Sequence, residues 1–294
     1  LCGEMATDPT QASTTGFYAL DEQAWDQERS EALGIPASWL PPIRECGTAV
    51  GELQTAAATH FGLAAGTPVV IGGADSQLAL LAVGVMGVGE VGLVAGSTAP
   101  VQRVTDGPVC DPSLWCERFV LPGHFVLESS AGSLGHLIES IAGLIHAEAR
   151  DPVAKLLADA GRAEAGAGGR LATLSTPVMD ARRLELPIAS LSWASMLGGP
   201  AFPESALASR AGVEATAYAL RANLEHLSEC LGSPATKVAV AGRLSGSATW
   251  RRVVANVLGV PLQFGASSDS SALGAALCAG VGSGLFVDLA EAAT

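Results

Sequence analysis

Residues 69–75 read Val-Val-Ile-Gly-Gly-Ala-Asp, three β-branched residues followed by two glycines, an alanine and a carboxylate. The apolar run predicts a short buried strand, which the Gly-Thr-Pro turn at 66–68 would introduce. Asp75 would then lie just beyond the C-terminal end of a strand, where open α/β sheets hold their ligands. The two glycines would let a ligand approach the backbone closely.

Asp75 has two interpretations, and its immediate sequence leaves both open. A carboxylate at such a strand end can take a proton from a hydroxyl group that attacks phosphorus. It can equally serve as the N-terminal cap of the helix that the apolar residues 78–85 predict.

Helices and strands alternate on both sides of this stretch, with short connections between them. A β-hairpin is expected from strands at 90–95 and 100–104. The alternation predicts the α/β class with some parallel strand pairing. The other expected elements are helices at 26–33, 55–61, 134–149, 210–231, 248–258 and 271–279, strands at 124–128, 237–241 and 261–264, and loops at 161–169 and 242–247.

Two turns of small residues offer hydrogen-bond donors to a phosphate group. Gly96-Ser97-Thr98 closes the expected hairpin, and its N–H and hydroxyl groups suit phosphate oxygens. The alternative there is an ordinary β-turn. The loop 242–247 precedes a helix whose N-terminus would point toward a phosphate. The alternative for this loop is a plain connection between a strand and a helix.

The composition describes a well-packed globular chain of 294 residues, with 49% hydrophobic residues, 15% charged residues and 35 glycines. Its formal charge of −13 argues against nucleic acid or an anionic membrane surface as a partner. Because Lys155 and Lys237 are the two lysines, an anionic ligand would be held by local donors rather than by the overall field. The apolar stretches 78–95 and 270–287 are interrupted by glycines, serines or a glutamate, so we expect buried core rather than membrane spans.

Several common catalytic motifs are absent from the sequence, among them G-x-x-x-x-G-K-[ST], G-x-S-x-G and H-E-x-x-H. The six cysteines form no C-x-x-C pair and the five histidines lie far apart, so no metal site made by protein side chains alone is expected. Scattered free thiols are typical of a reducing cytoplasm, where we expect the chain to reside.

The order of these features resembles that of the FGGY family of carbohydrate kinases. A carboxylate after two glycines, a Gly-Ser-Thr turn and a late Gly/Ser loop ending in Trp-Arg follow one another as in that family. The variants GGADSQ at 72–77 and LESSAG at 127–132 are most similar to xylulose-kinase-like and autoinducer-2-kinase-like members. Other segments that look like those of the family are ATDPTQASTTG at 6–16, LGIP at 33–36, LPP at 40–42, GEL at 51–53, GTPVVIGGAD at 66–75, ATWRRVVANVLGVP at 248–261 and SSALGAA at 270–276.

The resemblance implies the actin-like ATPase fold, an α/β fold that is ribonuclease H-like and has two domains. Residues 1–83 would be the C-terminal, incomplete part of the first FGGY domain, and residues 84–294 would be the second, nucleotide-binding domain. Because the first phosphate loop of the family is absent from the sequence, we expect an N-terminally truncated piece of a kinase. Such a piece would expose apolar surface, which favours a homodimer.

The resemblance also implies roles for individual residues. Asp75 would be the catalytic base, and Asp75 and Gln77 would contact the substrate. ATP and Mg²⁺ would be the cofactors. The second phosphate loop would consist of Gly96, Ser97 and Thr98, and the adenosine loop would contain Gly242, Arg243 and Ser247.

The expected activity is ATP-dependent phosphorylation of a hydroxyl group on a small sugar or polyol. The alternative is a non-catalytic nucleotide- or sugar-binding relative, a pseudokinase. Arg243 bears on this choice, because the family usually has a second glycine at its position. A guanidinium group there could crowd the adenine or stack on it.

Overall fold

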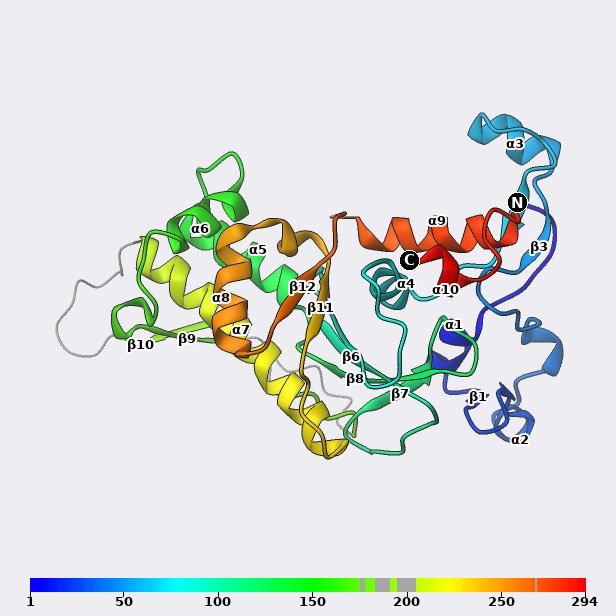
Figure 1. Cartoon of the computed structure of the whole chain (residues 1–294), viewed down its shortest axis with the longest axis horizontal. Coiled ribbons are helices and arrows are strands. Elements are labelled where there is room, and N and C mark those ends of the chain that lie inside the picture. Colours follow the sequence, from blue (N-terminus) through cyan, green and yellow to red (C-terminus); the bar gives the residue numbers. More distant parts are fainter. Residues whose placement is uncertain (175–177, 183–190, 195–204, 268) are drawn as a thin grey trace.

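A six-stranded mixed sheet forms the centre of the described structure (Figure 1). The computed structural model describes residues 1–174, 178–182, 191–194, 205–267 and 269–294. The strand order is β12-β11-β5-β6-β8-β7, and β12, β11 and β5 run parallel while the remaining neighbours are antiparallel. The strands are β5 (Val91–Val94), β6 (Pro100–Thr105), β7 (Trp115–Arg118), β8 (Phe125–Ser130), β11 (Val238–Ala241) and β12 (Leu262–Phe264).

The predicted hairpin and the predicted parallel pairing are both confirmed. In the hairpin, Val91 lies opposite Arg103 and Leu93 lies opposite Val101. β11 is buried along its whole length, as expected for a central strand with parallel neighbours and helices on both faces. The α/β class is therefore correct.

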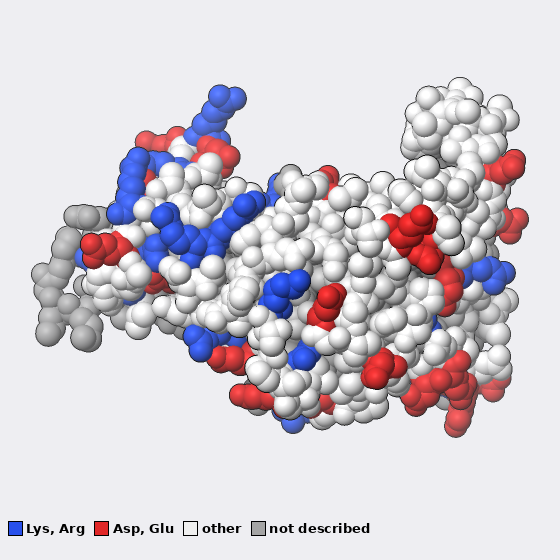
Figure 2. Space-filling view, in the orientation of Figure 1, with Lys and Arg blue, Asp and Glu red and all other residues white. Residues whose placement is uncertain are grey.

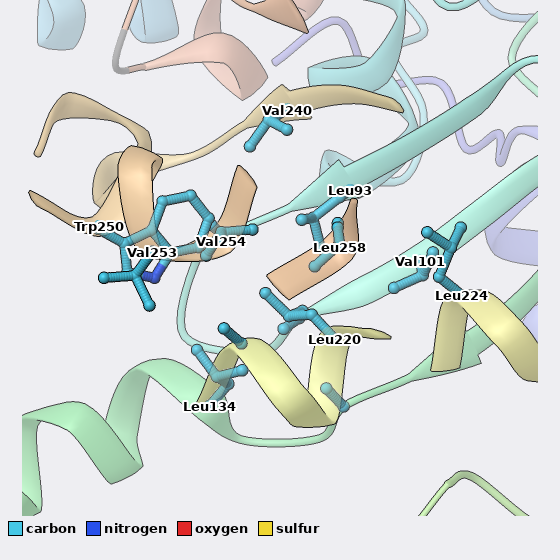
Figure 3. Close-up of a cluster of buried hydrophobic side chains, with 14 of the residues drawn as sticks. Leu93, Val101, Leu134, Leu220, Leu224, Val240, Trp250, Val253, Val254 and Leu258 are labelled. Carbon is cyan, nitrogen blue, oxygen red and sulfur yellow. The ribbon is translucent and has the colours of Figure 1, made fainter. Parts of the chain in front are cut away.

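One face of the sheet is covered by four helices, which lie on the left of Figure 1. The indole of Trp250, on α8, is fully buried, and Leu93, Val101 and Val240 extend from three neighbouring strands into the same cluster (Figure 3). This cluster fixes the position of the loop that precedes Trp250. The four helices are α5 (Leu134–Ile145), α6 (Pro152–Ala160), α7 (Ser205–Cys230) and α8 (Ala248–Leu258).

The other face packs against α4 (Asp75–Ala82), beside which α9 (Ser270–Gly282) runs (Figure 1). α9 also contacts β4 (Pro68–Val70), and it is followed by α10 (Leu289–Ala292). The last long helix of the chain thus lies against elements from the first 83 residues. The domain boundary between residues 83 and 84 stays a prediction.

The first 74 residues form short elements at one end of the molecule (Figure 1). β4 was predicted as a buried strand, but its residues are exposed or half-buried, because within the described residues it pairs with β3 alone. The elements of this region are α1 (Pro9–Thr14), β1 (Tyr18–Ala19), β2 (Ala24–Trp25), α2 (Gln27–Ala32), the 3₁₀ helix η1 (Ala37–Trp39), β3 (Ala49–Glu52) and α3 (Thr55–Phe61).

Several boundaries differ from the sequence-based expectation. The helix expected at 134–149 ends at Ile145, and a separate helix, α6, follows it. The loop expected at 242–247 contains the 3₁₀ helix η3 (Arg243–Gly246), and the loop expected at 161–169 ends in the 3₁₀ helix η2 (Ala167–Gly169). Strands β9 (Leu171–Leu174) and β10 (Leu191–Ala194) form an antiparallel pair that was not expected. Among the helices described, none has the length and apolar character needed to cross a membrane.

Replacing Gly274 with alanine is expected to lower the free energy of unfolding by about 2–3 kcal/mol. A Cβ at Gly274 would lie 2.1 Å from the carbonyl oxygen of Leu78, so α9 and α4 would have to separate. Chemical denaturation measures the change. Gly143→Ala is the matched control, because a Cβ at this position in α5 meets nothing within 4 Å. Equal stability of the two variants would contradict the close contact between the helices.

Candidate active site

Asp75 is the first residue of α4, and its side chain is exposed. The cap of this helix is Ala74, which has no side-chain hydrogen bond, and Asp75 Oδ1 instead accepts from the N–H of Ser76 at 2.7 Å. The interpretation of Asp75 as the helix cap is therefore wrong. One oxygen of its carboxylate is oriented by the helix, and Oδ2 has no hydrogen-bond partner within the described residues.

The turn before Asp75 is held by the N-terminal segment of the chain. Asp8 caps α1 and accepts hydrogen bonds from the N–H and the hydroxyl group of Thr10. Thr10 Oγ1 in turn accepts from the N–H of Ala74 at 2.7 Å. Two of the sequence motifs, 6–16 and 66–75, thus meet in space to position the carboxylate.

Gly73 is required by the protein itself rather than by a ligand. A Cβ there would lie 2.9 Å from Val120 Cγ1 and 3.1 Å from Cys46 Sγ. The expectation that both glycines let a ligand approach is thus wrong for Gly73, because protein side chains occupy that space.

A cavity of about 380 Å³ opens in front of Asp75 at the C-terminal ends of β5 and β11. Its wall also contains Asp269 and the first residues of α9, so the N-termini of α4 and α9 both lie at this cavity. Helix N-termini carry partial positive charge and free N–H groups. Of the sequence-predicted residues, the cavity brings together Asp75, Gly96, Ser97, Thr98, Gly242 and Arg243.

The Gly96-Ser97-Thr98 turn is exposed at this cavity, and α5 supports it from behind. The N–H of Gly96 donates to the carbonyl of Thr98 at 3.1 Å, and the N–H of Gly135 donates to the carbonyl of Ser97 at 3.1 Å. A Cβ at Gly135 would lie 2.1 Å from Gly96 O, so only glycine allows this contact. The start of α5 therefore fixes the backbone of the turn.

A second cavity of about 400 Å³ shares Gly96, Ser97 and Arg243 with the first. Ser247, which the sequence assigned to the adenosine loop, lines it and also caps α8 by accepting from the N–H of Trp250. Much of the wall is apolar, which suits the flat ring of a nucleobase. The apolar residues are Ala95, Ile138, Val153, Ala154, Leu157 and Leu244.

Gln77 lies away from both cavities. Its side chain is fully buried, and its Nε2 donates to Glu117 Oε2 at 3.1 Å. Burial raises the pKa of Glu117, an effect that the hydrogen bond from Gln77 opposes. The substrate contact expected of Gln77 has no support in this arrangement and stays a prediction.

The sequence interpretation missed several residues that line the cavities. Asp269 and Ser271 come from the start of α9, and Ser271 Oγ donates to the carbonyl of Asp75 at 3.0 Å. Asp269 directly precedes an apolar helix, so a capping signal could have drawn attention to it. Asp151, which caps α6 and precedes a proline, carries a similar signal for the α6 residues of the second cavity, whereas Gly135 carries none.

The residues of the two cavities fit a nucleotide with Mg²⁺. An apolar cavity adjoins a small-residue turn and two helix N-termini, the arrangement that a base and a phosphate chain require. Asp75 and Asp269 line the phosphate-side cavity, and Mg²⁺ is usually bound through one or two carboxylates together with substrate phosphates. Within the part of the chain that is described, no group of three metal-binding side chains was found.

Charge is unevenly spread over the surface. On the face shown in Figure 2, Lys and Arg gather over α6 and α8, whereas Asp and Glu gather over the elements of the first 74 residues. On this face the positive charge thus gathers at the end that carries α6 and α8, despite the net charge of −13.

Replacing Gly242 with alanine is expected to lower the free energy of unfolding by about 1–3 kcal/mol and to weaken nucleotide binding. Gly242 has a φ of +93°, and a Cβ would lie 2.5 Å from the carbonyl oxygen of Ala95, which lines the second cavity. Thermal unfolding and ATP titration measure the two effects. Gly246→Ala in the same loop is the control, because a Cβ there meets nothing within 4 Å. If both variants behave alike, the strained backbone at Gly242 does not shape the site.

Comparison with known proteins gives the family. The N-terminal domain of the FGGY family of carbohydrate kinases matches residues 1–82, and the C-terminal domain of that family matches residues 93–283. The chain therefore belongs to the FGGY family of carbohydrate kinases. This confirms the family suggested by the motif order, and with it the actin-like ATPase fold.

Individual relatives agree with this result. The chain is 32% identical over 297 residues to an autoinducer-2 kinase of Yersinia pestis (strain Pestoides F), covering 97% of this chain and 55% of the relative. It is 27% identical to a xylulose kinase of Rhodospirillum rubrum, with a TM-score of 0.77, covering 100% of this chain and 58% of that one. A gluconate kinase of Lactobacillus acidophilus, at 23% identity, TM-score 0.80 and coverage of 99% and 58%, shares the fold. The chain spans about half the length of the curated relatives it matches.

Proposed function

We propose that the chain carries the catalytic base and the nucleotide site of an ATP-dependent kinase for a hydroxyl group of a small sugar or polyol. The observation that carries the proposal is the exposed carboxylate of Asp75, which opens into a cavity lined by the Gly96-Ser97-Thr98 turn and the starts of two helices. Such a carboxylate needs a proton donor on one side and a phosphate group on the other, and the cavity offers room for both.

In this mechanism the free Oδ2 of Asp75 accepts the proton of the substrate hydroxyl as that oxygen attacks the γ-phosphorus of ATP. The N–H groups of Ser97 and Thr98 and those at the α4 and α9 N-termini hold the phosphate chain, and ADP leaves. Asp75 or Asp269, together with phosphate oxygens, would hold Mg²⁺, which would supply positive charge beside the phosphates. The apolar second cavity receives the adenine ring.

The relatives support the substrate class. The three similar kinases described above are named for autoinducer-2, xylulose and gluconate, which points to a small sugar or polyol rather than to a macromolecule. We also propose a cytoplasmic location, which the free cysteines favour. A homodimer is proposed on the basis of exposed large apolar side chains such as Met5, Trp39 and Val287.

A pseudokinase is the second candidate. The observation that favours it is Arg243, which stands where the family usually has glycine and lines both cavities. Under this alternative the gene product binds a nucleotide or a sugar without transferring phosphate.

The test has two parts. ATP with Mg²⁺ is titrated into the 294-residue chain by calorimetry, and the full gene product is incubated with ATP and a panel of sugars and polyols, with mass spectrometry of the products. Binding together with a phosphorylated sugar supports the kinase. Binding without any phosphorylated product supports the pseudokinase, and the absence of nucleotide binding overturns the nucleotide site.

A further inference from the structure

Arg243 lies at the wall that the two cavities share. It follows β11 and Gly242, begins η3, and lines both cavities together with Gly96 and Ser97. Its side chain is 84% exposed, and its closest ionic partner among the described residues is Glu139 of α5, at 3.9 Å between Nη2 and Oε1. A guanidinium group held by one long ion pair at the surface can turn to a ligand at little cost.

Most of the charged side chains around the two cavities are negative. Among the described residues that line them, the one cation is Arg243, and two of the carboxylates face each cavity. A polyphosphate in this place would be repelled unless positive groups offset the carboxylates. Backbone N–H groups do so in part, and Arg243 adds a full charge. The carboxylates are those of Asp75, Asp269, Glu139 and Asp151.

The position of Arg243 selects one part of the nucleotide. With the transferred phosphate beside Asp75 in the first cavity and the base against Ile138 and Leu244 in the second, the shared wall lies alongside the middle of the phosphate chain. We propose that Arg243 binds the α- or β-phosphate of the nucleotide and leaves Glu139 when the nucleotide enters, a role that rests on the proposed function. The planar fork of arginine suits two phosphate oxygens at once.

This inference predicts that Arg243 distinguishes phosphorylated from unphosphorylated nucleosides. Adenosine, AMP, ADP and ATP are titrated with Mg²⁺ into the chain by calorimetry at one fixed ionic strength. Arg243→Gln is expected to raise the dissociation constants of ADP and ATP about ten- to a hundredfold and to leave that of adenosine unchanged. Glu139→Gln is expected to lower the dissociation constant of ATP about two- to fivefold, because it frees the guanidinium group of Arg243.

The controls separate this contact from general charge and from stability. Arg252→Gln removes the same charge from an exposed position of α8 that lines neither cavity, and it should leave all four dissociation constants unchanged. The double variant Glu139→Gln/Arg243→Gln should still bind ATP more weakly than the unaltered chain, and Glu139→Gln should strengthen ATP binding less when Arg243 is absent than when it is present. Thermal melts confirm that each variant is folded.

The outcomes that overturn the inference differ from those that overturn the proposed function. If Arg243→Gln weakens the binding of adenosine as much as the binding of ATP, the guanidinium group contacts the nucleoside and not the phosphates. If ATP binds the variant as tightly as the unaltered chain, Arg243 has no part in binding while the nucleotide site itself stands. If the unaltered chain binds none of the four ligands, the proposed function fails, and this inference fails with it.

Discussion

Replacing Asp75 with asparagine is expected to lower ATP-dependent phosphoryl transfer by a factor of about 10²–10⁴. The amide cannot accept the proton that the substrate hydroxyl loses, so the attacking oxygen stays protonated as it approaches phosphorus. The turnover number of the full gene product at saturating ATP and sugar measures the effect.

Nucleotide binding and stability should survive this change. The amide oxygen of the introduced asparagine would still accept from the N–H of Ser76, the contact that Asp75 Oδ1 makes at 2.7 Å, so the start of α4 keeps its geometry. Asp106→Asn is the matched control, because Asp106 is exposed after β6 and lines neither cavity. A transfer rate near that of the unaltered enzyme would remove Asp75 from the mechanism.

The local parts of the fold could be predicted because their signals are local. α8 has the predicted bounds, since the Ser247 side chain caps its start and Gly259, with a φ of +69°, ends it. The hairpin of β5 and β6 follows from two apolar strands around a Gly-Ser-Thr turn. The order of motifs along the chain then identified the family.

Elements that depend on distant partners could not be predicted in the same way. β7 reads Trp-Cys-Glu-Arg, which has no apolar alternation, and it becomes a strand by pairing with β8. α6 begins with a capping aspartate, Asp151, and a proline at its first turn, a local signal that apolar periodicity alone does not reveal. The packing of α9 on α4 depends on Gly274, whose role is visible once Leu78 is known to face it.

The residues of the site divide in the same way, into those with a local sequence signal and those brought together from distant segments. Asp75 and the small-residue turns are contiguous in sequence and were found, whereas Gly135, Asp269 and the α6 wall come from segments far apart. Gln77 was expected beside Asp75, but residues two apart on a helix point in different directions. Asp75 therefore faces the cavity while Gln77 is buried against Glu117.

Raising the pH from about 5 to about 8 is expected to destabilise the folded chain through Glu128, and Glu128→Gln is expected to remove that contribution. Burial, with the nearby charge of Glu117, raises the pKa of Glu128 from 4.5 to about 8. In this range the folded chain keeps a proton that the unfolded chain has released. The contribution of Glu128 to the free energy of unfolding is therefore fully present below its pKa in the unfolded chain. It is lost as the pH rises through its pKa in the folded chain, by about 1.4 kcal/mol per pH unit at most.

Burial retains the proton on Glu128 although the hydrogen bond from Gln102 opposes the rise in its pKa, and the same amide offers that proton an acceptor. Gln102 Nε2 donates to Glu128 Oε2 at 2.6 Å, while Gln102 Oε1 is buried and has no hydrogen-bond partner among the described residues. A protonated Glu128 can donate its O–H to that oxygen, and an ionised one cannot. Glutamine at this position donates an N–H instead, so the pair stays complete at every pH.

Chemical denaturation at a series of pH values between about 5 and 8 tests this prediction. The stability of Glu128→Gln relative to the unaltered chain should rise with pH, by a few kcal/mol over the whole range. Glu225→Gln is the matched control, since Glu225 is exposed on α7 and pairs with Arg221 at the surface, where removing the charge has little effect on stability. Because every other titrating group is the same in the chains compared, a difference that stays constant with pH would mean that Glu128 is ionised in the folded protein.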